Sequence, residues 1–478
     1  MKLCVACLGL LVLSACKLGP DYVTPELDMP DAWQRTVEDE LDDDAAPLAR
    51  WWESLDDSVL TELIERGATQ NLDLRVAFAR IERARALYGI AAGQRVPDVD
   101  GAGFAIRARS SESTTPFLPP GLGRTNDIYN TGINGSWEVD LWGRVSRSIE
   151  ASDAQLGASI ENYRDVLVVL LAQIGFTYVE VRELQARIAF LDRNIESQRD
   201  TLQLTRDRYE TDIAPELDLR QAELNLANTE SQMPVLRQLL AQAVHRLGVL
   251  VGEHPGALVT LLEEPSPIPS GAGAPRTGLP ADLVRRRPDV RRAERRLAAA
   301  TAEVGIATAA LYPEFRLNGS LGYEATSDLL DSANVAWSFG PAFNWNLFDG
   351  GRVRGRIRVE EAEVEEALAS YEGAVLAALE DVENALTFYL EERIRRDALT
   401  RSVEAAERSV QLVRELYRSG LTDFQNVLDT ERFLFQQQDQ LAASEGQVVQ
   451  NLINLYRALG GGWQPEPEAE PDQSEVTR

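Results

Sequence analysis

The sequence Tyr209-Glu210-Thr211-Asp212-Ile213 recurs as Tyr417-Arg418-Ser419-Gly420-Leu421, at a spacing of 417 − 209 = 208 residues. The same spacing carries Gly143-Arg144-Val145 onto Gly351-Arg352-Val353. A repeat of this length is typical of a duplicated domain half rather than of a short solenoid unit. Two related halves favour pseudo-symmetry, and pseudo-symmetry suits a ring-shaped assembly.

Each copy contains a long segment without proline, from Arg144 to Tyr209 and from Gly351 to Tyr417. At about 1.5 Å per residue, each segment predicts a helix of roughly 100 Å. Apolar residues in the second segment follow coiled-coil spacing. Each long helix is expected to turn and return as one helix, to about Gly252 in the first copy and to about Leu459 in the second.

The two turns carry helix start and stop signals. Gly420 is expected to end the second long helix, and Thr422-Asp423-Phe424-Gln425 has the pattern of a capping box for the return helix. Pro215 suits the first position of the other return helix. Shorter helices are predicted over Leu72 to Gly93 and over Arg285 to Ala310.

Two stretches before the long helices change to a period of two. Apolar and polar residues alternate over 129–141 and over 335–347, and Phe104 and Ile106 are expected on the apolar face of an earlier strand. Such alternation is typical of strands with one apolar and one polar face. Aromatic residues near the ends of the apolar face favour a transmembrane β-barrel. A soluble sandwich with a wet polar face is the alternative.

The N-terminus reads as a bacterial lipoprotein signal. A short apolar run ends in Leu13-Ser14-Ala15-Cys16, which predicts cleavage before Cys16 and acylation of that residue. Lys17 in the second mature position favours sorting to the outer membrane, with lipid as the partner. Cys4 and Cys7 leave with the signal, so the mature chain cannot form an internal disulfide.

Composition narrows the function classes. The 478 residues carry a formal net charge of −28, which argues against nucleic acid as a partner. The only histidines are His245 and His254, so zinc and Ser-His or Cys-His chemistry is nearly excluded. No cofactor and no enzymatic role are expected. After the signal, no apolar run near twenty residues occurs, so no transmembrane helix is expected either.

The predicted fold class is mixed and mainly α, with long antiparallel helices and four strands per chain. Four strands cannot close a barrel, and an open sheet in lipid leaves unpaired backbone groups. Several chains must therefore share one barrel. Three chains would supply 3 × 4 = 12 strands, an even number of workable size.

The chain resembles the TolC-like outer-membrane efflux factors, in their lipoprotein branch. The resemblance covers nearly the whole mature chain and is carried by the following segments: Leu13-Ser14-Ala15-Cys16, Gly19-Pro20-Asp21-Tyr22, Trp51-Trp52, Arg287-Pro288-Asp289-Val290, Leu311-Tyr312-Pro313, Asn346-Leu347-Phe348-Asp349-Gly350-Gly351 and Tyr417 to Arg432. It implies a homotrimer with a 12-stranded barrel in the outer membrane and a helical barrel in the periplasm. It also implies a periplasmic adaptor and an inner-membrane transporter of the RND type as partners.

The resemblance also implies a gate at the periplasmic helix tips. Asp429 lies where the family places a ring-forming aspartate, and Arg432 follows one helical turn later. Asp218 and Tyr417 match positions that tie neighbouring helix pairs together in the closed state. Asn426 replaces a second acidic residue that the family often has, which predicts a less acidic ring.

The turns next to this gate are the expected adaptor contacts, at Asp212, Pro215, Gly420 and Thr422. Thr422 stands where some members carry a bridging arginine, so that link is not expected here. The predicted function is a passive exit duct for drugs and small toxic compounds. The alternatives are a type I protein-secretion duct and a lipid-anchored periplasmic scaffold without a pore.

The predicted organisation divides each half into upper helices, a hairpin and a long helix pair. The boundaries are 1–15 for the signal, 16–50 for a lipidated tether, 51–97 for the first upper helices, 98–142 for the first hairpin, 143–254 for the first long helix pair, 255–280 for a linker, 281–312 for the second upper helices, 313–350 for the second hairpin, 351–462 for the second long pair with the gate, and 463–478 for a disordered tail.

Overall fold

The computed structural model describes residues 17–35, 46–109, 111, 125–270, 280–325 and 334–464. The predictions made for the signal, for Cys16 and for residues 465–478 of the tail lie outside this range. The chain divides into two compact units. The first consists of Met1–Glu26, Arg80–Ile160 and Arg292–Glu372, and the second of Leu27–Ala79, Glu161–Arg291 and Gly373–Arg478.

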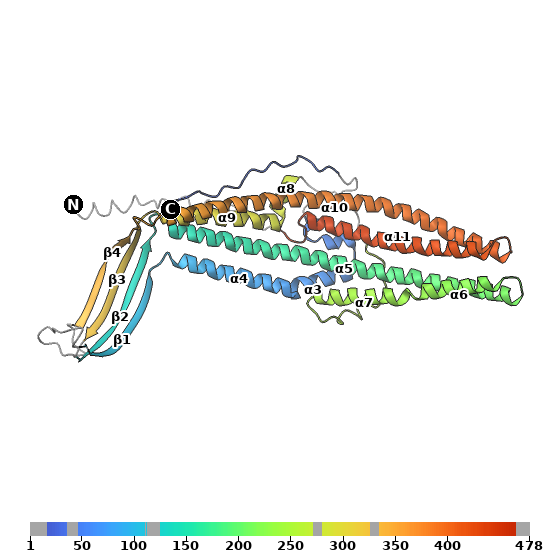
Figure 1. Ribbon diagram of the computed structural model, residues 1–478, viewed down its shortest axis with the longest axis horizontal. Helices are drawn as coiled ribbons and strands as arrows, with labels where there is room; N and C mark the ends of the chain where they lie inside the picture. The colour runs from blue at the N-terminus through green and yellow to red at the C-terminus, as the bar shows by residue number, and fades with distance from the viewer. Residues whose placement is uncertain are drawn as a thin grey trace. The chain divides into compact units, whose positions relative to one another are not determined.

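The first unit contains a four-stranded antiparallel sheet in the order β1-β2-β3-β4 (Figure 1). The strands are β1 (Asp98–Arg109), β2 (Thr125–Val139), β3 (Glu314–Ala325) and β4 (Val335–Asn344). Each half of the sequence contributes one hairpin, and the two hairpins join where β2 pairs with β3. The prediction of four strands per chain in a mainly helical fold is therefore confirmed.

The register of the sheet corrects the face predicted for β1. Phe104 pairs with Asn130, which in turn pairs with Glu324, so Phe104 lies on the polar face. Ile106 is two residues away and shares that face. Ala105 instead lies opposite Tyr129 on the apolar face. The prediction was wrong because alternation within one strand cannot say which face its neighbour presents.

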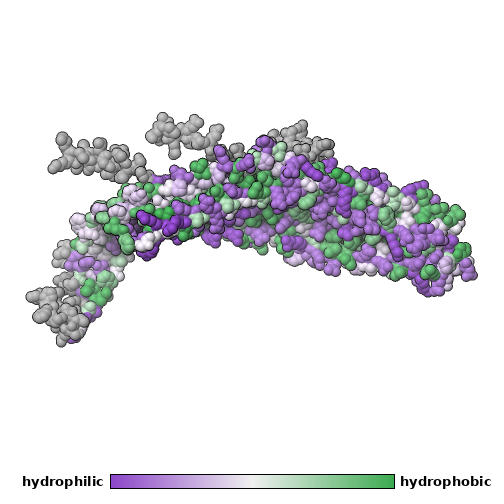
Figure 2. Space-filling view, turned by 45° about the horizontal axis from the view of Figure 1, so that its top comes forward, coloured by the Kyte–Doolittle hydropathy of each residue, from purple (hydrophilic) through white to green (hydrophobic). Residues whose placement is uncertain are grey.

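Within the described residues, most of the outer strands of this sheet are exposed. Every residue of β1 is exposed, and in β4 the aromatic residues Trp337 and Phe339 are 76% and 71% exposed. Hydrophobic side chains are visible on the surface of the strands at the lower left of Figure 2. Among the described residues, β1 and β4 each pair with one strand only, so both outer edges of the sheet are open.

The two long helices are α5 (Arg144–Glu210) and α10 (Arg352–Arg418), each of 67 residues. Each follows a glycine with positive φ, Gly143 at +74° and Gly351 at +87°, a conformation that L side chains rarely adopt. Carboxylates cap both starts. Asp140 accepts from the backbone N–H groups of Val145 and Ser146, and Asp349 accepts from those of Gly351 and Val353. The predicted proline-free helices are confirmed.

The return segments differ from each other. The second is a single helix, α11 (Phe424–Ala458), whereas the first is split into α6 (Glu216–Glu230) and α7 (Met233–Leu250). The predicted single helix is therefore wrong for the first copy. The break falls at Ser231 and Gln232, just before Pro234, which has no N–H to donate to the preceding turn.

The predicted starts of the return helices need correction. Pro215 precedes α6 as its N-cap residue with extended backbone, instead of occupying the first helical position. Asp423, and not Thr422, is the N-cap residue of α11, and its side chain makes no capping hydrogen bond. The Thr422 hydroxyl accepts instead from the Asn426 side chain at 2.9 Å. The capping box is therefore absent, because Thr422 lies one residue too early.

Shorter helices complete the fold. They are α2 (Ala46–Ala49), the 3-10 helix η1 (Trp51–Leu55), α3 (Ser58–Gln70), α4 (Leu72–Gly93), α8 (Pro280–Arg286) and α9 (Pro288–Ala309). The helix predicted from Arg285 to Ala310 is interrupted at Arg287, where Pro288 starts a new helix. Among the helices of the described ranges, none has the length and apolarity to span a bilayer.

The core of the second unit is built around Trp51. Its ring is 1% exposed and stacks on Tyr456 of α11, with ring centroids 5.7 Å apart. Gly175 of α5 permits this approach, because a Cβ atom there would lie 2.8 Å from the Trp51 ring. Trp51 thus fastens η1 to α5 and α11 in this unit.

Candidate functional site

The turns at the ends of α5 and α10 have the same backbone geometry. Leu421 donates its N–H to the Leu416 carbonyl at 2.8 Å, and Ile213 donates to Arg208 at 2.8 Å. These are the long-range bonds of Schellman motifs, each with a left-handed residue before the donor. That residue is Gly420 at φ +71° in one turn and Asp212 at φ +57° in the other. Gly420 therefore ends α10 as predicted.

These turns expose apolar side chains. Ile213, Leu217 and Leu421 are 64%, 64% and 74% exposed. Hydrophobic residues also reach the surface at the right-hand end of Figure 2, where α6 and α11 meet their turns in Figure 1. Apolar groups of this kind suit contact with another protein surface. The predicted adaptor contacts therefore lie in apolar, exposed turns, and their role stays a prediction.

Asp429 lies on the exposed side of α11. The flanking Val427 and Leu428 are buried, so the carboxylate is directed away from the packed side of the helix. Its two oxygens accept hydrogen bonds from the Gln425 amide at 3.0 Å, one turn earlier. This geometry leaves the charge available to a neighbouring chain.

Arg432 is directed toward another helix. Its Nε donates to Oδ1 of Asn225 on α6 at 3.0 Å. Among the ion pairs of the described residues, none joins Arg432 to Asp429. Both residues are exposed on α11, and Arg432 also links α11 to α6. A joint role of the two in a gate stays a prediction.

Tyr417 and Asp218 flank a small apolar core at the tips. Tyr417 is 3% exposed and packs with Phe424, Val427, Leu428 and Ala222 of α6. The guanidinium of Arg208 lies 4.7 Å from the centre of the Tyr417 ring and donates to the Tyr417 carbonyl at 2.6 Å. Burial raises the pKa of Tyr417 above its ordinary value.

Asp218 is near the same arginine. Partial burial and then the charge of Asp423 raise the pKa of the Asp218 carboxyl, while Arg208 acts in the opposite direction. The hydrogen bonds described between side chains do not join Asp218 directly to Tyr417. Arg208 is therefore a tip residue that the sequence patterns did not single out, although it directly precedes the repeated Tyr209.

A buried ionic cluster near Asp429 was also not predicted. Glu431 is 4% exposed and accepts from Thr201 of α5 at 2.7 Å and from Arg414 of α10 at 2.6 and 3.0 Å. Arg414 donates as well to the Ser197 carbonyl of α5 at 3.2 Å. A carboxylate buried in this way holds three helices together and is costly to leave unpaired. In the sequence, Glu431 follows Val427 by four residues and Leu428 by three, so all three lie on the same packed face of the helix. This spacing was the signal that could have predicted the burial of Glu431.

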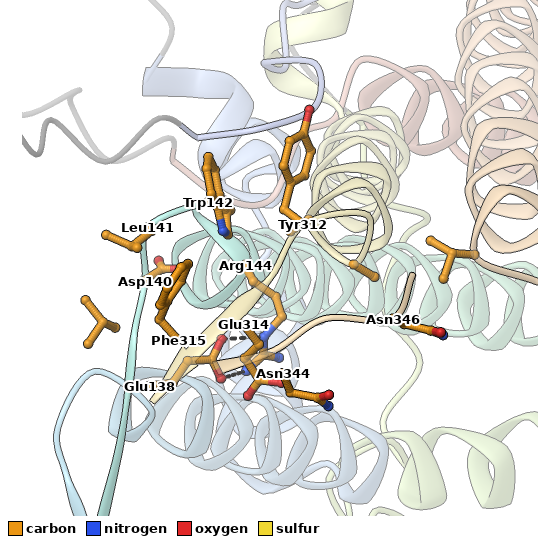
Figure 3. A pocket seen from close by; sticks show the side chains of 14 residues that line it. Glu138, Asp140, Leu141, Trp142, Arg144, Tyr312, Glu314, Phe315, Asn344 and Asn346 are labelled. Carbon is orange, nitrogen blue, oxygen red and sulfur yellow. Dashed lines mark hydrogen bonds and ion pairs between the residues drawn. The ribbon is translucent and has the colours of Figure 1, made fainter. Parts of the chain in front are cut away.

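A pocket in the first unit lies where the strands meet the long helices (Figure 3). Trp142 stacks on Tyr312 with centroids 4.8 Å apart and donates to the Pro313 carbonyl at 2.8 Å. Arg144 faces Glu138 and forms a bidentate ion pair with it. These contacts fix the strand-to-helix turn, so we interpret the pocket as a structural corner.

Comparison with known proteins identifies the class. An antiparallel sheet with open edges, joined to pairs of long helices, is the architecture of outer-membrane channels. The outer-membrane channel OprN shares it with a TM-score of 0.84 and 36% identity, over 94% of this chain and 100% of that one. The open state of the Neisseria gonorrhoeae MtrE channel matches with a TM-score of 0.80 and 25% identity, over 94% and 99%.

The sequence matches the family Outer membrane efflux protein over residues 63–253 and 279–461, and the chain belongs to this family. The toluene efflux pump outer membrane protein TtgI of Pseudomonas putida is 31% identical over 95% of this chain and 97% of its own. Nodulation protein T of Rhizobium leguminosarum bv. viciae is 29% identical over 97% and 94%. The protein is thus an efflux channel of the outer membrane, and the resemblance seen in the sequence is confirmed.

Proposed function

We propose that this protein is the passive exit duct of a tripartite efflux pump, closed at rest by a gate at the helix tips. The observation that carries the gate is Asp429, an exposed carboxylate on a helix whose other side is packed against α5, α6 and α10 through Arg432, Glu431 and Tyr417. Because α11 is firmly packed on its other side, the Asp429 carboxylate is held in a fixed position. In a symmetric assembly it could lie close to the Asp429 carboxylates of the neighbouring chains around the symmetry axis.

The open edges of the sheet support the proposal of a trimer. In lipid, the unpaired backbone groups of β1 and β4 would each cost several kcal/mol. Pairing β4 of one chain with β1 of the next removes both edges. Three chains then give a barrel of 3 × 4 = 12 strands, and this homotrimer is part of the proposal.

The two halves of the chain are proposed to be an internal duplication. The equal lengths of α5 and α10, the left-handed glycines before them and the matching Schellman motifs support this proposal. In a trimer, two similar halves per chain would arrange the long helices with pseudo-sixfold symmetry.

The transport step is proposed to need no chemistry in this chain. A periplasmic adaptor would dock on the turns that contain Asp212, Pro215, Gly420 and Thr422. If the adaptor binds the open arrangement of the helices more tightly, docking shifts the population toward it. An inner-membrane transporter of the RND type would supply the substrate and the energy.

Drugs and small toxic compounds are the proposed substrates. This rests on relatives named for toluene or solvent efflux and for pyoverdine export. These names favour small-molecule export over the secretion of proteins. The family match also speaks against a scaffold without a pore.

Single-channel recording in planar bilayers tests the gate. We expect wild-type trimers to show small, mostly closed steps, and Asp429→Ala to raise the resting open fraction about tenfold, which corresponds to about 1.4 kcal/mol. The physical reason is that carboxylates bridged around the axis by cations or arginine hold the closed state, and alanine removes them.

Asp207→Ala is the matched control for this experiment. Asp207 is an exposed carboxylate on α5 that accepts from Gln203 four residues earlier, just as Asp429 accepts from Gln425. The control should leave conductance unchanged. Equal conductance in wild type and Asp429→Ala would remove Asp429 from the gate, and inserted trimers that never conduct would contradict the duct itself.

A further inference from the structure

Three large apolar side chains lie on the polar face of the four-stranded sheet. The register places the even-numbered residues of all four strands on this face, among them Phe104 and Ile106 of β1 and Ile128 of β2. Ile128 pairs directly with Ile106 and lies diagonally from Phe104, so the three are neighbours. They are 49%, 50% and 38% exposed for Phe104, Ile106 and Ile128. We call them the apolar strand cluster.

The fold of a hairpin does not require this cluster. The repeat relates β1 to β3 at a spacing of 314 − 98 = 216 residues, and β2 to β4 at a spacing of 345 − 137 = 208, which aligns Trp137 with Trp345. The second copy forms the same hairpin with a small residue at each equivalent position. These residues are Ser320, Gly322 and Ala336. All other even-numbered residues of the four strands are polar, charged, alanine or glycine.

The apolar strand cluster lies in the half of the sheet that is remote from the long helices. β2 ends at Val139, shortly before α5 begins at Arg144, whereas Ile128 is near the other end of β2, which begins at Thr125. In a barrel with lipid outside and water inside, the polar face lines the lumen. With the helices in the periplasm, the cluster would lie toward the extracellular end of that lumen.

A carboxylate lies on the same face and in the same row across the strands. Phe104 pairs with Asn130, and Asn130 pairs with Glu324 of β3. Because neighbouring strands are about 4.8 Å apart, the Cα atoms of Phe104 and Glu324 are separated by roughly 10 Å. Glu324 is exposed, and its Oε1 accepts from the Asn130 amide at 2.9 Å. Among the ion pairs of the described ranges, none includes Glu324, so its charge is available to a ligand.

An apolar surface beside an available carboxylate is complementary to an amphiphilic organic cation. The apolar body of such a compound would cover the cluster and remove apolar area from water. Its cationic group would be attracted by Glu324 and by the face of the Phe104 ring. A compact cation would gain only the ionic contact, and an anion would be repelled. The charge of Glu324 therefore selects the kind of solute that this wall can hold.

We propose that the apolar strand cluster and Glu324 form a binding site for amphiphilic organic cations on the lumen wall of the barrel. The proposal rests on the proposed function, because only a shared barrel makes the polar face a lumen. Closing the barrel pairs β1 with its neighbour edge to edge, which leaves this face open. Three chains then provide three equivalent sites at one level, where a departing compound of this class is held briefly before release.

Block of single-channel current in planar bilayers tests the site. Tetrabutylammonium has four apolar arms around one positive charge and is added to both compartments. Tetramethylammonium is the matched probe, because it has the same charge and much less apolar surface. During open periods of wild-type trimers, the half-blocking concentration should be about tenfold lower for tetrabutylammonium than for tetramethylammonium.

Three full-length variants locate the block. Phe104→Ser and Ile128→Ala introduce the residues that the second copy carries, and Glu324→Gln removes the charge with little change of shape. Each should raise the half-blocking concentration of tetrabutylammonium about tenfold. Phe104→Ser should leave the weak block by tetramethylammonium unchanged. Asn134→Ser is the control, because Asn134 lies on the same face of β2 but roughly 20 Å from Ile128 along the strand, and it should leave both blocks unchanged.

All variants are compared as assembled trimers on native gels, and Glu324→Gln alone still tests the site if an apolar variant does not assemble. The site is overturned if tetrabutylammonium blocks wild type no better than tetramethylammonium. It is also overturned if the assembled test variants keep the wild-type block, or if Asn134→Ser weakens the block as much as they do. These results leave the duct intact. Inserted trimers that never conduct would instead contradict the proposed function, and the site with it.

Discussion

Glu183 shows what burial does to a single side chain in this fold. It lies on α5 with Arg187 at 3.4 Å, and burial raises its pKa to about 7, while the nearby Glu180 and Asp439 act in the same direction. Gly446 of α11 lies against it, since a Cβ atom there would be 2.7 Å from a Glu183 carboxylate oxygen. The carboxyl is therefore crowded as well as poorly hydrated.

Stability should fall as this carboxyl ionises. Because its pKa is higher in the folded state than in the unfolded chain, unfolding is favoured increasingly between pH 4.5 and 7, and the loss is complete above pH 7. The loss is on the order of 3 kcal/mol. Chemical denaturation at pH 5 and pH 8 should show it in wild type and not in Glu183→Gln. Glu196→Gln, at an exposed carboxylate further along α5, is the control and should keep it.

The site residues that were predicted from the sequence are marked by a local pattern, whereas the role of the missed ones depends on contacts with residues far away in the sequence. Asp429 could be singled out because a family pattern places an aspartate there, and the structure shows it exposed. The partner of Arg432 could not be predicted, because Asn225 is 207 residues away in sequence. Glu431 was missed for the same reason, since its burial depends on Arg414 and Thr201 from two other helices.

Helices and strands were predictable where the signal is local. Proline-free segments predicted α5 and α10, and alternation predicted the hairpins, because both patterns act within a few residues of the chain. The split between α6 and α7 was not predicted, although Pro234 lies beside it. The face of β1 was predicted wrongly because it depends on pairing with β2, and a register is set between strands.

The turns that follow α5 and α10 allow a prediction about the stability of these helix ends. Both need a left-handed residue, which costs a non-glycine side chain about 1–2 kcal/mol. Gly420→Val should therefore destabilise the tip of α10 and α11 by about that amount, and Asp212→Gly should leave the other tip unchanged or slightly more stable.

Hydrogen exchange of the amides in the last turns measures both effects. Protection should fall around residues 416–424 in Gly420→Val and should not fall around residues 208–216 in Asp212→Gly. Slower exchange in Gly420→Val than in wild type would contradict the argument from the left-handed backbone.

For the whole molecule, the prediction of one lipid anchor can be tested directly. Acyl chains contribute about 0.8 kcal/mol for each buried methylene, so two or more chains make a stable anchor. Cells labelled with palmitate should label the wild-type protein at Cys16, and Cys16→Ser should abolish the label. Cys4→Ser is the control, because that residue leaves with the signal and its variant should label normally. Label retained in Cys16→Ser would contradict the predicted lipobox.

The open edges of the sheet have a consequence for inheritance. If the unpaired backbone groups of β1 and β4 can form hydrogen bonds only with strands of other copies, then a chain with a damaged strand still assembles into closed oligomers together with intact chains. In a cell that makes both forms, most rings would contain at least one damaged copy. A mutation that spoils the strand surface without preventing assembly should therefore behave as dominant, whereas one that prevents the chain from folding should be recessive.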